Sequence, residues 1–189
     1  MSMAPVAPKR LEGRKVAAVA CFDSFGKLAM TLLAACRREG AETTLHLLEL
    51  NNRALSRRQR LEIRRIDPRT RIEKHSWSDL HNLASPMAGH VDALILGLDG
   101  RRSRDALLQL HGAWSHSAIR PRLISAYPGI LFRFALEGML DRSGADLLCL
   151  NSQQDLSLYR TGCAALGLDS RNAVVTGLPI LWRTHPRTE

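Results

Sequence analysis

Short apolar runs alternate with longer segments of helical period along this chain, and that alternation constrains the fold more than any other feature. Two of the runs, residues 91–98 and 145–150, are almost continuously apolar. A strand of that kind is buried on both faces, as in a parallel sheet covered by helices. The alternation itself is typical of repeated βαβ units. The sequence therefore predicts an α/β fold, a Rossmann-like three-layer domain with a mostly parallel sheet of about seven strands.

The pattern places seven strands and six helices. The strands are predicted at Lys15–Cys21, Glu42–Leu48, Arg71–His75, Val91–Leu96, Arg122–Ala126, Asp146–Leu150 and Ala173–Thr176. The helices are predicted at about Phe25–Arg38, Ser56–Ile66, Ser78–His90, Ser103–Ser115, Ile130–Arg142 and Asp155–Leu166. Gly40 is the expected C-terminal cap of the first helix, and Ser78 and Ser103 are the expected N-caps of two others.

Length and composition favour one domain with a substantial core. The chain has 189 residues, of which 45% are hydrophobic, and this size suits a single domain. We expect a disordered lead-in at residues 1–14, one Rossmann-like domain at 15–182 and a tail at 183–189. Neither a secretory h-region nor an apolar run of roughly 18 residues occurs. Four widely spaced cysteines without a CxxC pair suit a reduced cytoplasm.

Positive charge is concentrated in one segment. The net charge is +9, and residues 51–71 alone hold eight arginines against two acidic residues. Such a cluster attracts anions of any kind, although an arginine-rich helix can also be an ordinary solvated surface. The segment Arg57–Arg65 could touch anionic lipid at the inner membrane face, or a phosphate. Binding to nucleic acid is not expected, because residues 51–71 contain no aromatic platform.

The loop after the first strand is the first candidate site. In an open α/β sheet, ligands bind at the carboxyl ends of the strands. Residues 21–27 could hold an anion at a helix N-terminus, and Asp23, Ser24 and Lys27 are the candidate groups. The loop lacks the first glycine of a Walker A motif, and the chain has no GxGxxG. The alternative is that Asp23 or Ser24 is simply an N-cap.

Two later loops also carry suitable groups. After the fifth strand, Ser125–Gly129 contains Pro128, which fixes a turn that could bring Ser125, Tyr127 and Gly129 against a ligand; a purely structural turn is the alternative. After the sixth strand, the polar segment Asn151–Gln153 offers amides and hydroxyls suited to sugar hydroxyls. The candidate groups are Asn151, Ser152 and Gln153. Asn151 or Ser152 could also cap the next helix.

Other chemistries are not indicated. The chain has neither a GxSxG elbow nor an HExxH motif, and its histidines and cysteines show no metal-ligand spacing. We therefore expect no metal site and no cofactor.

Three segments resemble a known family. They are RLISAYPGILF at 122–132, GADLLCLNSQQDL at 144–156 and VVTGLP at 174–179. Together they resemble the end of the N-terminal domain of GT-B type glycosyltransferases, which have two Rossmann-like domains, and most of all an uncharacterised bacterial family known also from cyanobacteria. The close resemblance covers about a third of the chain, and the rest matches by its alternation of strands and helices.

The resemblance implies an acceptor-side half. In this fold the N-terminal domain shapes the pocket for the acceptor, here a cell-envelope glycan or glycolipid, and the second domain binds the nucleotide-sugar donor. That second domain is missing here, so the chain would be incomplete as an enzyme. The loops at Asp23-Ser24, Ser125–Gly129 and Asn151–Gln153 would face the cleft between domains. No residue matches an established catalytic base, and Asp23 is the carboxylate best placed by its loop position to deprotonate an acceptor hydroxyl.

Two other functions stay open. The chain could be a stand-alone α/β module that binds a small anion or nucleotide without catalysis, or a regulatory or scaffolding remnant. The apolar segment Leu178–Trp182 would favour self-association if a second domain does not cover it.

Overall fold

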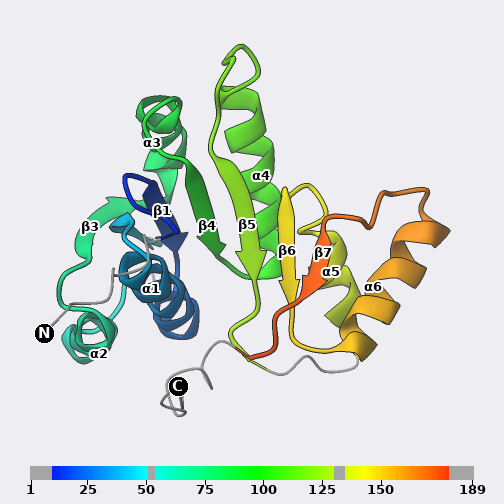
Figure 1. The fold of residues 1–189 in the computed structure, drawn as a ribbon, viewed down its shortest axis with the longest axis horizontal. Coiled ribbons are helices and arrows are strands. Elements are labelled where there is room, and N and C mark those ends of the chain that lie inside the picture. The colour runs from blue at the N-terminus through cyan, green and yellow to red at the C-terminus, as the bar shows by residue number, and fades with distance from the viewer. Residues whose placement is uncertain (1–9, 51–53, 130–134, 179–189) are drawn as a thin grey trace, which may run out of the picture.

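A computed structural model describes residues 10–50, 54–129 and 135–178 of the chain (Figure 1). Seven strands alternate with helices. The strands are β1 (Lys15–Ala20), β2 (Glu42–Glu49), β3 (Arg71–Ser76), β4 (Ala93–Gly97), β5 (Arg122–Ala126), β6 (Leu147–Leu150) and β7 (Ala173–Val175). The helices are α1 (Asp23–Arg38), α2 (Arg57–Ile66), the 3-10 turn η1 (Trp77–Asp79), α3 (Leu80–Met87), α4 (Gly100–Ala113), α5 (Ala135–Leu140) and α6 (Gln153–Ala165).

The strands form one sheet in the order β3-β2-β1-β4-β5-β6-β7. Every pair of neighbours is parallel. The predicted fold class, an α/β Rossmann-like domain with a parallel sheet of seven strands, is confirmed. Each strand lies within two residues of its predicted bounds, because the apolar runs that mark them are short and well separated.

Helices cover both faces of the sheet, as the apolar runs require. Ala18 and Ala20 of β1 point toward α1 and α2, while Ala17 and Val19 point toward α3 and α4. Figure 1 shows α1 and α2 in front of the sheet and α4 and α5 behind it. This division follows from right-handed crossovers, because the chain moves in opposite directions along the sheet before and after β3.

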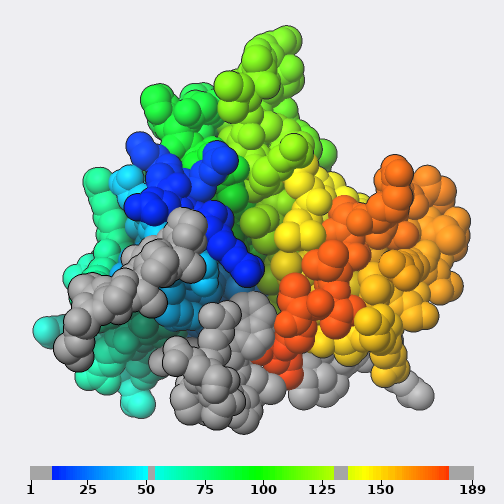
Figure 2. All heavy atoms as spheres, in the orientation of Figure 1, coloured from blue at the N-terminus to red at the C-terminus, as the bar shows by residue number. Residues whose placement is uncertain are grey.

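The helices cover the two faces of the sheet unevenly. On the α1 side, β5 and β6 carry Ile124 and Cys149, which are only partly buried, and Val174 of β7 is 39% exposed. Among the described residues no helix lies over this part of the sheet (Figures 1 and 2). The three strands are therefore packed against helices mainly on the opposite face.

Two of the predicted helix caps are wrong. Asp99 is the N-cap of α4 and accepts from the Arg102 N–H, whereas Ser103 is fully buried inside the helix. Ser78 lies within η1, and Asp79 occupies the N-cap of α3. In both places an aspartate near the serine takes the capping position. The prediction for Gly40 is confirmed, since it follows α1 with a φ of +99°.

Two further predictions concern the chain outside the sheet. The helix predicted at Ile130–Arg142 is described only as α5, because residues 130–134 lie outside the described residues. The predicted lead-in is described from Arg10 onward, where Leu11 packs on the α1 side of the core and its N–H donates to the Glu39 carbonyl at 2.8 Å. In the described part of the chain, no helix combines the length and apolar character of a membrane span. Most of the apolar segment Leu178–Trp182 lies outside the described residues.

Candidate functional site

The strand order reverses between β1 and β4, which creates a crevice at their carboxyl ends. The connection after β1 passes to α1 on one face, and the connection after β4 passes to α4 on the other. The N–H of Cys21, just after β1, donates to the carbonyl of Gly97 at 3.2 Å. Ligands of open α/β sheets bind at such a reversal, so this edge is the first place to seek a site.

Phe22 has a strained backbone at this crevice. Its φ is +63°, the only positive φ of a non-glycine residue in the described part of the chain. Its ring lies under the Arg102 guanidinium, with 4.9 Å between the Arg102 Cζ and the ring centroid. Arg102 in turn pairs with Asp99, at 2.5 Å. Strain of this kind costs roughly 1–3 kcal/mol and clusters at functional sites, and here it lies where the loops after β1 and β4 touch.

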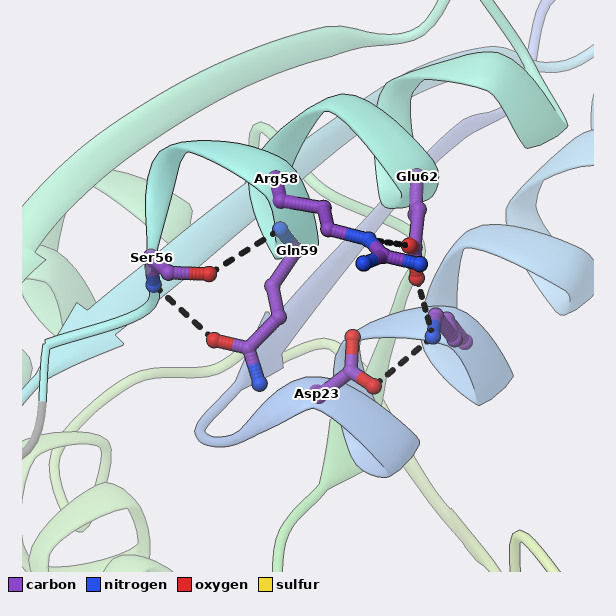
Figure 3. Close-up of polar contacts among 6 residues, drawn as sticks. Asp23, Ser56, Arg58, Gln59 and Glu62 are labelled. Carbon is purple, nitrogen blue, oxygen red and sulfur yellow. Dashed lines mark hydrogen bonds and ion pairs between the residues drawn. The ribbon is translucent and has the colours of Figure 1, made fainter.

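Asp23 is the first residue of α1 and is held by an ion pair. Its Oδ2 accepts from the Lys27 Nζ at 2.7 Å, and the same Nζ donates to Glu62 of α2 at 2.8 Å (Figure 3). Glu62 also accepts from Arg58 at 3.0 Å. The hydrogen bonds that Lys27 donates to Asp23 and Glu62 raise the pKa of Lys27. The network fixes one oxygen of Asp23 and ties α1 to α2.

The other oxygen of Asp23 is unused. Oδ1 is buried and has no hydrogen-bond partner among the described residues. The alternative prediction for this loop, an N-cap at Asp23 or Ser24, is wrong, because Phe22 is the N-cap and makes no side-chain bond. Ser24 is exposed. A buried carboxylate oxygen without a partner is an unsatisfied acceptor, which makes Asp23 a candidate for contact with a ligand hydroxyl.

The loop after β5 is anchored by a buried arginine. Arg142, only 1% exposed, donates to the Tyr127 hydroxyl at 3.1 Å and to the carbonyls of Leu98 and Gly138, each at 2.5 Å. Its guanidinium lies over the Tyr127 ring, 4.2 Å from the centroid. Burial lowers the pKa of Arg142 and raises that of Tyr127 to about 12. Arg142 thus joins the ends of β4 and β5 to α5.

The loop after β6 is joined to its neighbour by Asn151. The Asn151 amide donates to the Gly129 carbonyl at 2.5 Å. Ser152 is the N-cap of α6 and accepts from the Asp155 N–H at 3.1 Å, which confirms that one of these two residues caps the helix. Gln153 is exposed. This loop therefore has its geometry fixed by Asn151 and Ser152, while Gln153 is free to reach a ligand.

The structure does not bring all the predicted residues to one surface. Ser125 is fully buried in β5, and its Oγ has no partner among the described residues. Tyr127 is 7% exposed. Lys27 is engaged between α1 and α2, while the residues after β5 and β6 lie on the far side of β4. The sequence analysis missed Phe22, Asp99, Arg102 and Arg142. The pair Asp99-Gly100 directly after an apolar strand was a usable signal for Asp99.

A separate cluster of side chains that can bind metals lies on β2 and the edge strand β3, away from the crevice. His46 of β2 and Glu73 and His75 of β3 place one nitrogen or oxygen each within 4.8 Å of one another. Burial lowers the pKa of His46, opposed by the nearby Glu73. The cluster forms across two strands, so the spacing of histidines along the chain could not indicate it.

Comparisons with known proteins agree with the fold. Residues 16–189 match the model of a family described as "Putative glycosyltransferase (DUF6716)". No curated protein matches the sequence. The crystal structure of LpCGTa in complex with UDP matches with a TM-score of 0.53 at 13% identity, over 87% of this chain and 52% of that one. A short-chain dehydrogenase from Shigella flexneri matches with a TM-score of 0.51 at 10% identity, over 92% of this chain and 84% of that one. At these identities both structures show the fold alone, and the chain spans about half the length of LpCGTa.

Proposed function

Because the chain belongs to the family described as "Putative glycosyltransferase (DUF6716)", we propose that it is the acceptor-side, N-terminal half of a GT-B type enzyme. In this proposal a second domain supplies the nucleotide-sugar donor. The likeness to LpCGTa over about half of that chain, in a complex with UDP, supports a division of this kind. A regulatory or scaffolding remnant would need no site, and a stand-alone module would need no second domain.

The observation that carries the proposal is the geometry of Asp23. Its Oδ1 is buried without a partner at the carboxyl edge of the sheet, next to the reversal between β1 and β4. The ion pair to Lys27 holds Oδ2, so the side chain presents its other oxygen in a fixed direction. A general base must lie within hydrogen-bond reach of the proton that it removes, so in this proposal the acceptor hydroxyl displaces the atoms that bury Oδ1.

The proposed reaction is a transfer with proton removal. The acceptor oxygen forms a bond to the anomeric carbon of the donor sugar, and the bond between that carbon and the nucleoside diphosphate breaks. The acceptor hydroxyl gives its proton to Asp23 Oδ1, and the electron pair leaves with the diphosphate. The positive ends of α1 and α4 border the same edge, and helix N-termini favour negative charge.

In this proposal some of the remaining candidate residues contact the acceptor, and the others hold or shape the loops around it. Ser24 and Gln153 are exposed and would contact acceptor hydroxyls directly. Asn151 and Ser152 would hold the loop after β6 in place, with Gly129 at the point where the loops after β5 and β6 join. Tyr127 and the buried Ser125 would act by shaping the wall behind these loops.

The test is a calorimetric titration with UDP and a panel of UDP-sugars. The chain is titrated alone and together with a separately encoded βα domain from the same genome. We expect binding only when the second domain is present, and Asp23→Asn should then abolish transfer while leaving donor binding intact. Asp105→Asn, on the surface of α4, is the matched control. Tight nucleotide binding by the chain alone would instead support the stand-alone α/β module, and undiminished transfer by Asp23→Asn would remove Asp23 from the mechanism.

We also propose that α2 places the acceptor site at an anionic membrane surface. Arg57, Arg58, Arg64 and Arg65 are exposed on this helix, together with Leu61, which is 48% exposed. Basic side chains near an anionic bilayer contribute about 1 kcal/mol each. The double variant Arg64→Glu, Arg65→Glu should lose binding to phosphatidylglycerol vesicles, and Arg160→Glu on α6 should not. Equal sedimentation of both variants would refute this role for α2.

A further inference from the structure

Three metal-ligand side chains meet across the strands β2 and β3. The Nδ1 of His46 lies 3.2 Å from the Nε2 of His75 and 3.2 Å from the Oε2 of Glu73. The third side of this triangle, from His75 Nε2 to Glu73 Oε2, is 3.4 Å. Two imidazole nitrogens and one carboxylate oxygen therefore surround a common point.

The register of the sheet produces this arrangement. His46 pairs directly with Glu73, and the next same-face position on β3 is His75. Side chains two residues apart on a strand point to the same face, here the face that also carries Leu48 and is covered by α3. Three polar groups on a largely apolar sheet face are costly to bury unless their polar atoms are satisfied.

We propose that His46, Glu73 and His75 bind a divalent transition-metal ion, with Zn²⁺ as the best fit. Tetrahedral ligands at about 2.0–2.1 Å from Zn²⁺ are about 3.3 Å from one another, and the three distances here are 3.2, 3.2 and 3.4 Å. Octahedral ligands at a similar radius are closer, at about 3.0 Å. The triangle thus matches one face of a tetrahedron and leaves the fourth position for water or another ligand.

The surroundings support a metal in three ways. The Arg71 guanidinium forms an ion pair with the other oxygen of Glu73, at 2.7 Å, which holds the carboxylate and leaves Oε2 for the ion. Outer partners of this kind orient metal ligands. The side chains of Glu73 and His75 are 26% and 22% exposed, while that of His46 is 11% exposed, so an ion can enter from one side. His75 also lines a hollow of about 450 Å³ at the ends of β2 and β3.

This inference is independent of the proposed transferase activity. The site lies on β2 and β3, away from the crevice between β1 and β4. It needs no donor, acceptor or second domain to be tested.

The experiment uses the full chain, stripped of metal with a chelator, and measures binding of Zn²⁺ by calorimetry and of Co²⁺ by its visible absorption. We expect one ion per chain, a tetrahedral Co²⁺ spectrum and a rise in melting temperature with Zn²⁺. Glu73→Gln and His75→Gln keep the size of partly exposed side chains, and each should weaken Zn²⁺ binding at least about 100-fold, since even outer-shell partners are worth 10–100-fold. His116→Gln, on an exposed histidine remote from the cluster, should bind like the wild type.

Competing sites have distinct signatures. The chain has four free cysteines, and their thiolates would give Co²⁺ a sulfur charge-transfer band in the near ultraviolet. A spectrum dominated by that band, a wild-type chain that binds no Zn²⁺, or variants that bind as tightly as the wild type would each overturn the proposal. In the last two cases the three side chains form a hydrogen-bonded network only.

Discussion

Gly97 allows α1 to approach the sheet closely, and replacing it with alanine tests how tightly the crevice is built. A Cβ at this position would lie 2.9 Å from the Phe25 carbonyl oxygen, 3.1 Å from the Ala20 Cβ and 3.2 Å from the Ala29 Cβ. The nearest of these atoms belongs to the backbone of α1, so no side-chain rotation can relieve the contact. Gly97→Ala must move α1 away from β1 and β4, and with it the start of α1 at Asp23.

The expected cost follows from two opposing effects. Inserting a methyl group into a filled core costs about 1–3 kcal/mol. Replacing glycine by alanine restricts the unfolded chain, which returns about 0.4–1 kcal/mol. We therefore expect Gly97→Ala to lower the free energy of unfolding by roughly 1–2 kcal/mol. In urea, at a slope of about 2 kcal/mol per molar, the midpoint falls by roughly 0.5–1 M.

A second glycine provides the control. Gly112 lies within α4, and a Cβ there would meet nothing within 4 Å. Gly112→Ala should therefore raise the free energy of unfolding by roughly 0.5–1 kcal/mol, as helix propensity alone predicts. If Gly97→Ala is as stable as the wild type with an unchanged urea slope, the close approach of α1 does not have the rigidity that we assign to it.

Three further outcomes are expected. Burial opposes ionisation of Asp67, but the hydrogen bonds from Arg37 and Thr70 lower its pKa below the usual value. The stabilising effect of Asp67 is therefore present at neutral pH and is lost as pH falls through the folded-state pKa. Asp67→Asn should cost roughly 2–4 kcal/mol at pH 7 and flatten the acid limb of a pH–stability curve. Arg142→Met removes three hydrogen bonds, two to buried acceptors and one to the half-buried Gly138 carbonyl. It should cost about 2–4 kcal/mol in urea unfolding, against about 1 kcal/mol for Tyr127→Phe, and equal losses would contradict the anchoring role of Arg142. Burial raises the pKa of Cys21 to about 12, so this thiol should resist alkylation in the native chain at pH 8, and rapid labelling there, mapped by mass spectrometry, would disprove its burial.

The strands were predictable because their signal is local. The runs at 91–98 and 145–150 read as buried strands from composition alone, and β4 and β6 lie within them. The start of α4 was misplaced at Ser103 because a serine and an aspartate are both good caps, and only the structure shows that Asp99 accepts from the Arg102 N–H.

The candidate site was predictable only in part. The rule that ligands bind at strand ends pointed to Asp23, but it could not show that one carboxylate oxygen is bound and the other free. Arg142 looked like one of many arginines, since its burial depends on packing between α4, α5 and the end of β4. The pairing of His46 with Glu73 depends on the register between β2 and β3, which no spacing along the chain reveals.

The uneven cover of the sheet implies a gradient of hydrogen exchange across it. β1 is paired on both sides and covered by helices on both faces, whereas β7 has three residues and one partner strand, with Val174 exposed. Amide protons should therefore exchange most slowly in β1 and fastest in β7, because local opening is easiest where few groups are buried. Asp23 then lies on the slowly exchanging half of the carboxyl edge and Asn151 on the faster half. A ligand that spans both halves would order the loop after β6 while leaving Asp23 where the free protein already holds it.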